Sequence, residues 1–289
     1  MNNAVQHILE PFSKVRGLLR TRSVDKSCSE KTSPSSQITD QPPLIVFPGG
    51  GIYFWWQAGA VKALQERYDI DKCSLTGASA GALIAVLAGC KIDMDYALQV
   101  AERLAVQNGV WGRACGLMGI WGSIIYEWLD IILPENAAEL CRGRVSVSVT
   151  SVHSSFPPLK RRSVGDFGTK RDLMQACLAS VHIPFFLDGR LFSGHRGAAC
   201  VDGSLTFVLR GKPWHFRPDE PEPALLVDHR TDEALMARRW GFLQTISQDA
   251  FRHMYQLGYA HVMRGHPPVA AAPAAPDEQA GLLLAGGGG

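Results

Sequence analysis

Apolar and polar positions repeat with two different periods along the middle of the chain. Residues 144–150 alternate with period two and are rich in valine, which is typical of a strand. Three shorter apolar runs, at residues 44–47, 73–75 and 198–201, are bounded by glycine, proline or polar residues. We interpret these runs as short strands.

Longer segments between the runs carry apolar residues three and four positions apart, which predicts helices. In residues 57–68, the side chains of Ala60, Val61 and Leu64 share one face. Residues 82–88 are apolar and rich in alanine, as in a buried helix. Further helices are predicted at residues 95–106, 120–132 and 173–179, the last preceded by a capping box at residues 169–172.

Predicted strands and helices alternate along the chain, and this order predicts an α/β fold. Such alternation favours a mostly parallel sheet whose two faces are covered by helices. We expect this domain to occupy residues 42–266. Residues 1–41 are predicted to be a disordered leader or a targeting segment, and residues 267–289, rich in proline, alanine and glycine, a disordered tail.

Composition and charge narrow the class of protein. The 289 residues are 46% hydrophobic and 19% charged, which suits one globular domain with flanking tails. The net charge of +2 gives no reason to expect a nucleic-acid partner. The seven cysteines are scattered and include no C-x-x-C pair, so we expect free, mostly buried thiols in a reducing compartment and no zinc site.

No segment of the sequence predicts a membrane span or a secretory signal. The most apolar stretch, residues 116–133, contains Glu127 and Asp130. Residues 1–41 lack a continuous apolar centre but combine basic residues with serines, so a transit peptide and a plain leader are both open. We expect a cytoplasmic protein, or a plastid or mitochondrial one if the leader is a transit peptide.

Residues 75–82 read LTGASAGA and place a serine between two glycines where a strand is expected to become a helix. In that context G-x-S-x-G predicts a nucleophile elbow, a tight turn that presents the hydroxyl of Ser79. Gly77 and Gly81 would leave room for neighbouring backbone. Small residues that only let a helix pack closely on a sheet produce the same pattern, so both interpretations stay open.

A second glycine-rich segment, FPGGG at residues 47–51, follows the first predicted strand and precedes the first predicted helix. Backbone N–H groups that converge there attract negative charge and can stabilise an oxyanion. A dinucleotide-binding loop is the rival hypothesis, but Phe54 stands where its third glycine is needed. A purely structural turn is the other alternative.

An aspartate at the end of the run at residues 198–201 could take the proton of Ser79. Asp202 is followed by glycine, and an Asp-Gly pair usually marks only a turn. The proton could pass to Asp202 directly or through a histidine. His215 and His229 lie downstream, in the Ser…Asp…His order of α/β-hydrolases, so a triad is an alternative to a dyad.

The two glycine motifs and the distal Asp-Gly together resemble the patatin-like phospholipase family. Residues 166–176 and 179–186, which include Asp166-Phe167-Gly168 and Ile183-Pro184-Phe185-Phe186, are similar to that family's middle segment. The resemblance covers roughly residues 44–210. It implies a three-layer α/β/α fold and a Ser–Asp dyad that works without histidine.

The resemblance also implies a role for each site residue and an activity. By this match Ser79 is the nucleophile and Asp202 its general base. The oxyanion hole is expected to consist of Gly49, Gly50 and Gly51, helped by the amide of Ala80. The implied activity is that of a serine lipid acyl hydrolase, with no metal or organic cofactor.

Two motifs depart from the pattern of the family. Its glycine loop usually continues as G-G-G-x-[RK]-G, whereas this chain has Ile52-Tyr53-Phe54 after the glycines. Its Asp-Gly-Gly or Asp-Gly-Ala motif appears here with Ser204 in the third position. The first departure affects the loop geometry and the choice of substrate more than the chemistry, and the second is mild because serine is small.

Three segments of the sequence could contact a lipid substrate. Residues 120–132 predict an amphipathic helix that is either an ordinary core helix or a lid or wall for an acyl chain. The aromatic run at residues 53–56 is likewise core or active-site surface. Residues 160–162, KRR in a Pro-rich loop, could meet lipid phosphates or simply be solvated.

We expect a glycerolipid substrate and peripheral contact with a membrane or lipid droplet. A non-catalytic lipid-binding or lipid-droplet coat protein with the same fold, and acyl transfer to another lipid, are the alternatives. The oligomeric state is not predicted by any pattern in the sequence.

Overall fold

The computed structural model describes residues 42–206, 223–238, 240–241 and 243–264. The predicted leader, residues 1–41, and the predicted tail, residues 267–289, lie outside the described residues, so the domain boundaries stay predictions. His215 lies outside them as well.

The described strands form one mixed sheet in the order β5-β6-β3-β2-β1-β7, with β4 paired to β3. Its four parallel strands are β1 (Leu44–Phe47), β2 (Ser74–Ala78), β3 (Val145–Val152) and β7 (Leu225–Leu226). Three further strands join through antiparallel pairs: β4 (Leu159–Val164) and β6 (Ala198–Val201) each pair with β3, and β5 (Ser193–His195) pairs with β6. The predicted α/β fold is therefore confirmed: β1, β2, β3 and β7 form parallel pairs, and the antiparallel pairs of β4, β5 and β6 make the sheet mixed.

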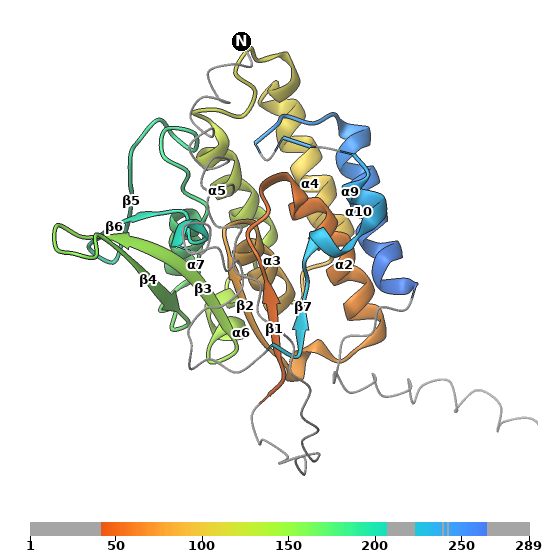
Figure 1. Cartoon of the computed structure of the whole chain (residues 1–289), viewed down its shortest axis with the longest axis horizontal. Coiled ribbons are helices and arrows are strands. Elements are labelled where there is room, and N and C mark those ends of the chain that lie inside the picture. Colours follow the sequence, from red (N-terminus) through yellow and green to blue (C-terminus); the bar gives the residue numbers. More distant parts are fainter. Residues whose placement is uncertain (1–41, 207–222, 239, 242, 265–289) are drawn as a thin grey trace, which may run out of the picture.

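The helices are α2 (Phe54–Arg67), α3 (Ala80–Gly89), α4 (Met94–Gln107), α5 (Trp121–Ile132), α6 (Ala137–Cys141), α7 (Lys170–Ser180), α9 (Glu233–Met236) and α10 (Gln248–Met263). The described residues also form four short 3-10 turns: η1 (Gly51–Tyr53), η2 (Ile70–Lys72), η3 (Val110–Gly112) and η4 (His229–Thr231). In Figure 1, α2, α4 and α10 lie on the β7 side of the sheet, and β4, β5 and β6 lie on the other side.

Helix α3 forms the centre of the core. All ten of its residues are buried, and it packs against β1, β2 and β3. Each large apolar side chain buried in this way contributes about 1.5–3 kcal/mol. Alanines and glycines make the close packing possible: a Cβ on Gly77 would lie 2.0 Å from the carbonyl oxygen of Gly81, and one on Gly81 would lie 2.0 Å from that of Phe47.

The predicted elements match the observed ones closely where the signal is local. The strands predicted at residues 44–47 and 198–201 have those bounds. Thr169 caps α7, because its hydroxyl accepts a hydrogen bond from the amide of Asp172 at 3.1 Å. Helix α2 begins earlier than predicted, at Phe54, because η1 leads directly into it.

The basic run KRR at residues 160–162 lies in strand β4 and not in a loop. Lys160 is exposed, whereas Arg161 and Arg162 are half-buried. The loop prediction is wrong because the run pairs with β3 over its whole length, opposite Val149, Thr150 and Ser151. Proline-rich residues before the run form only the turn of this hairpin.

The six cysteines in the described part of the chain are free thiols, and five of them are buried. This agrees with the expected free, mostly buried cysteines. Among the described helices, none combines the length and apolar character needed to cross a membrane.

Candidate active site

Ser79 occupies a strained turn between β2 and α3. Its backbone has φ 54° and ψ −128°, a region that residues other than glycine rarely adopt. Such a conformation costs about 1–3 kcal/mol and persists only where surrounding contacts hold it. Here the hydroxyl of Ser180 accepts a hydrogen bond from the amide of Ser79 at 2.9 Å and donates one to the carbonyl of Ser148 at 2.6 Å.

The pairing of β3 explains how Asp202 reaches this turn. One edge of β3 pairs with β4 along residues 147–152. The other edge pairs first with β2, as far as Ser148, and then with β6 at residues 150–151. Strand β6 therefore continues the line of β2 beyond its end. Residues that directly follow the two strands, Ser79 and Asp202, meet at this point.

The hydroxyl of Ser79 donates a hydrogen bond to Oδ2 of Asp202 at 2.6 Å. Both residues are buried, at 3% and 8% exposure, so the pair is shielded from bulk water. The amide of Asp202 donates to the carbonyl of His182 at 2.7 Å. Gly203 is required beside it, because a Cβ there would lie 1.9 Å from the carbonyl oxygen of Ser148.

Ser204 binds the second oxygen of the same carboxylate. Its amide donates to Oδ1 of Asp202 at 2.8 Å, and its hydroxyl donates to the same oxygen. Burial raises the pKa of the Asp202 carboxyl, and the hydroxyls of Ser204 and Ser79 oppose that rise because they stabilise the charged form. In the sequence Ser204 is only a mild departure from the family motif, and no local pattern predicts this contact.

We expect Ser204→Ala, which restores a residue typical of the family, to shift the pH dependence of any Asp202-dependent activity. Without the hydroxyl, the pKa of Asp202 rises further, and a base must be ionised to accept a proton. The acidic limb of the kcat/KM profile on a soluble ester should therefore move to higher pH. Ser163→Ala, at an exposed site in β4, is the control. An unmoved limb would show that the Ser204 hydroxyl does not tune this carboxylate.

The glycine loop lies beside Ser79 and offers free amides. A Cβ on Gly49 would lie 3.2 Å from Cβ of Ser79, so the two backbones are close. In the described residues, the amides of Gly50, Gly51 and Ala80 donate no hydrogen bond to protein atoms. Amides in this state are available to an anion. The predicted oxyanion residues are therefore brought together around Ser79, while their catalytic role stays a prediction.

Two buried contacts hold the glycine loop in place. The side-chain amide of Gln57 donates to the carbonyls of Pro48 at 2.9 Å and Val227 at 3.3 Å. On the other side, the ring of His229 stacks on Tyr53 with centroids 4.0 Å apart. A Cβ on Gly50 would lie 3.4 Å from this imidazole. The position that is basic in related loops is thus filled here by an aromatic stack.

His229 stacks on Tyr53 beside the glycine loop and makes no hydrogen bond to Ser79 or Asp202. Burial lowers the pKa of its imidazole to about 4, although Asp228 lies next to it, so the ring is neutral near pH 7. Across the part of the chain that the structure describes, neither Ser79 nor Asp202 hydrogen-bonds a histidine ring. Ser79 and Asp202 are thus in direct contact, whereas His215 lies outside the described residues, so the dyad stays a prediction.

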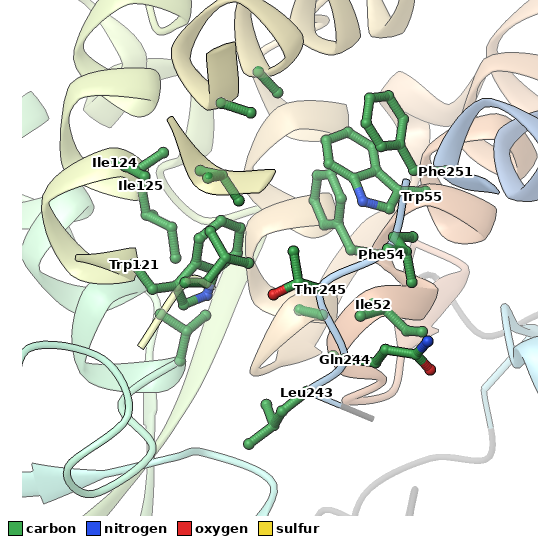
Figure 2. Close-up of a pocket in the computed structure, with 18 of the residues that line it drawn as sticks. Ile52, Phe54, Trp55, Trp121, Ile124, Ile125, Leu243, Gln244, Thr245 and Phe251 are labelled. Carbon is green, nitrogen blue, oxygen red and sulfur yellow. The ribbon is translucent and has the colours of Figure 1, made fainter. Parts of the chain in front are cut away.

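A cavity of about 140 Å³ opens beside Ser79. Gly51, Ser79 and Ala80 contribute to its wall, and the rest of the lining is almost entirely apolar. In Figure 2, Trp121, Ile124 and Ile125 line one side, Phe54, Trp55 and Phe251 line the other, and the segment with Leu243, Gln244 and Thr245 runs between them. Helices α2, α3, α4, α5 and α10 all contribute to the wall, together with η3 and the segments 181–186 and 243–246.

Both apolar segments singled out in the sequence, residues 120–132 and 53–56, contribute to this wall. Helix α5 is a core helix, because Ile124, Ile125, Trp128, Leu129 and Ile132 are buried, and four of its residues also line the cavity. The run at residues 53–56 is divided: Phe54 and Trp55 line the cavity, whereas Trp56 is buried and donates to Asp232 at 2.7 Å. Core and active-site surface were not exclusive alternatives.

The apolar lining also bears on the rival cofactor hypothesis. Phe54 begins α2 and its ring lies edge-on to Trp128, 5.5 Å between centroids. A phenyl ring thus stands at the position where a dinucleotide-binding loop needs its third glycine for close packing of helix on strand. Within the described ranges, no three His, Cys, Asp or Glu side chains gather in a way that could hold a metal ion.

Comparisons with known proteins agree with this architecture. The family model of the patatin-like phospholipases matches residues 45–209. The omega-hydroxyceramide transacylase of Homo sapiens is 31% identical over 58% of this chain and 31% of its own length. The human 1-acylglycerol-3-phosphate O-acyltransferase PNPLA3 is 30% identical over 56% of this chain and 34% of its own.

A third human relative, patatin-like phospholipase domain-containing protein 4, is 28% identical over 55% of this chain and 62% of its own length. The chain thus spans about a third of the first two relatives and less than two thirds of the third. In each case the similarity covers little more than half of this chain.

Proposed function

The chain belongs to the patatin-like phospholipase family, and from this premise we propose that it is a serine lipid acyl hydrolase that cleaves fatty-acyl esters of glycerolipids. The observation that carries the proposal is the 2.6 Å hydrogen bond from Ser79 Oγ to Asp202 Oδ2, at a strained turn beside an apolar cavity. A base within hydrogen-bond distance of a serine hydroxyl is the structural sign of an activated nucleophile.

In the proposed reaction, Oγ of Ser79 attacks the ester carbonyl while its proton passes to Oδ2 of Asp202. Charge develops on the carbonyl oxygen and is stabilised by the amides of Gly50, Gly51 and Ala80. The proton then moves to the alcohol that leaves, which yields an acyl-enzyme. Water, deprotonated by Asp202, attacks the acyl carbonyl, and the fatty acid is released as Ser79 regains its proton.

The cavity supports an acyl chain as the group that enters the site. Its lining is apolar, and its volume of about 140 Å³ is similar to that of a protein cavity that holds a benzene molecule. It would therefore enclose a short stretch of one chain, with the remainder directed to the mouth. A polar head group would stay outside this lining. Phospholipids, galactolipids and acylglycerols all meet this description.

Acyl transfer to a lipid alcohol is the second candidate function. Two relatives are named as a transacylase and an O-acyltransferase. An apolar cavity beside the nucleophile also favours it, because a lipid alcohol enters such a space more easily than water. In that reaction the acyl-enzyme forms in the same way, and the hydroxyl of the acceptor takes the place of water.

We expect the purified full chain to release fatty acid from phospholipid, galactolipid or triacylglycerol substrates, and Ser79→Ala to release none. Adding a lysophospholipid or monoacylglycerol separates the two candidates, because transfer lowers free fatty acid and raises the diacyl product. A chain that binds these lipids but turns over none of them would instead be the non-catalytic lipid-binding protein. Products should be separated and quantified by mass spectrometry.

A further inference from the structure

One loop exposes large apolar side chains next to the cavity. Residues 183–192, here called the 183–192 loop, follow α7 and lead into β5. Phe185, Leu191 and Phe192 are exposed by 56%, 46% and 39%. Water-exposed side chains of this size close together in one loop are uncommon unless they contact something.

The backbone of the 183–192 loop is strained at its most exposed ring. Phe185 has φ 65°, which is unfavourable for a bulky L residue. The conformation is held by hydrogen bonds from the amide of Phe185 to the carbonyl of Arg190 at 2.8 Å and from the amide of Phe186 to that of Ile183 at 3.1 Å. Burial of the Phe185 ring does not offset this strain, because the residue is 56% exposed.

The strained turn separates two phenylalanines with opposite surroundings. Phe186 is buried and lines the cavity together with Ile183, whereas Phe185 between them is exposed. Two consecutive residues of the loop therefore belong to different surfaces: Phe185 to an apolar outer surface and Phe186 to the apolar lining of the cavity. A hydrocarbon chain that contacts Phe185 from outside the protein would therefore lie next to the lining of the cavity.

A second segment, residues 110–122, also combines an exposed aromatic side chain with the cavity lining. Trp111 is 39% exposed and also lines the cavity, and its indole donates to the carbonyl of Ile246 at 2.9 Å. The amides of Gly119 and Gly122 donate to the carbonyls of Phe186 and Leu187 at 2.9 and 3.0 Å, which fixes this segment against the 183–192 loop. The exposed apolar groups thus belong to two segments that are joined to each other.

The charges of these two segments are few and mainly positive. Arg113 is the one charged residue in the sequence from 110 to 126. The 183–192 loop contains Asp188 and Arg190, both exposed. The guanidinium of Arg113 donates to the carbonyls of Gly116 at 2.9 Å and Met118 at 3.4 Å, but the residue stays exposed. An exposed arginine in the same segment as an exposed tryptophan is suited to the boundary between water and lipid, where its charge meets phosphate groups.

We propose that the 183–192 loop, with Trp111 and Arg113, is the surface by which the protein docks on an anionic lipid bilayer. Phe185 and Phe192 enter the interfacial region, and the mouth of the cavity faces the membrane. The use of this contact for substrate delivery rests on the proposed function, but the contact itself does not require catalysis.

The test uses the full chain carrying Ser79→Ala, so that vesicles are not degraded and binding is measured apart from activity. Sedimentation with vesicles of phosphatidylcholine and phosphatidylserine should show binding, and vesicles of phosphatidylcholine alone should bind at least several-fold less. Phe185→Gly should lower binding about tenfold or more, because the ring no longer leaves water. The same change should raise Tm, because glycine removes the strain.

Met263→Ser is the matched control. Met263 is 42% exposed at the end of α10, about 18 Å along the helix from the cavity residue Phe251. The Met263→Ser variant should bind vesicles as well as the Ser79→Ala chain without this second change. Three results would each overturn the proposal. Vesicle binding could fall equally in Met263→Ser and Phe185→Gly, it could be unchanged in Phe185→Gly, or the chain could show no preference for the anionic vesicles.

Activity on a water-soluble short-chain ester completes the experiment, with Ser79 present. Phe185→Gly should keep its kcat/KM, because that ester needs no membrane. A chain that binds vesicles through this loop but hydrolyses no ester would contradict the proposed function and leave the docking surface in place. A chain that hydrolyses the ester but does not bind vesicles would contradict the docking surface alone.

Discussion

Ser79→Ala and Asp202→Asn are each expected to lower ester hydrolysis by at least about 10³-fold. Alanine removes the nucleophile. Asparagine has the shape of aspartate and can still accept the hydrogen bonds of Ser204, but it cannot take a proton from Ser79. Because the two residues act as one proton-transfer unit, the double variant should be no slower than the slower single variant.

Kinetics on a soluble ester, with folding checked by circular dichroism, provide the measurement. Ser163→Ala and Asp249→Asn replace exposed residues of the same types and should behave like the unsubstituted chain. Full activity in Asp202→Asn would refute its role as the base. Losses in the double variant equal to the product of the single losses would show that Ser79 and Asp202 act independently.

Gly50→Ala is expected to lower kcat by roughly 10²–10³-fold with a small effect on KM. The new Cβ would lie 3.2 Å from Cβ of Tyr53 and 3.4 Å from the ring of His229, so the loop must shift by a few tenths of an ångström. That shift misplaces an amide whose hydrogen bond forms fully only with the charge of the transition state, which is why the loss should fall on kcat.

Gly168→Ala is the control for this variant, because a Cβ there would meet no atom within 4 Å. It should change neither kcat nor Tm appreciably. A Gly50→Ala protein with a lowered Tm and normal turnover would show that the loop is structural. The oxyanion donors would then have to be sought elsewhere, beginning with the amide of Ala80.

Local patterns were sufficient to predict the elements around the nucleophile. The strand at residues 44–47, the capping box at Thr169 and the strand-to-helix turn at Ser79 depend on neighbours within a few positions, and each matches the structure. The close approach of backbone at Gly77 and Gly81 was predicted from the same few residues.

Long-range pairing decided what the sequence could not show. Asp202 lies beside Ser79 because β2 and β6 share one edge of β3. From the residues alone this meeting was only one possibility, because an Asp-Gly pair usually marks a turn, and the family resemblance was needed to favour it. Strand β4 was taken for a loop because its basic residues hide the pairing with β3. Trp111 and residues 243–246 line the cavity, although neither segment carries a motif that marks it.

Covalent labelling with a fluorophosphonate tests the central claim most directly, because only an activated serine reacts at a useful rate. The full chain should gain one adduct, located at Ser79 by peptide mass spectrometry, and Asp202→Asn should label far more slowly. An unlabelled chain, or an adduct on another serine with Ser79 unmodified, would contradict the assignment of Ser79 as the nucleophile.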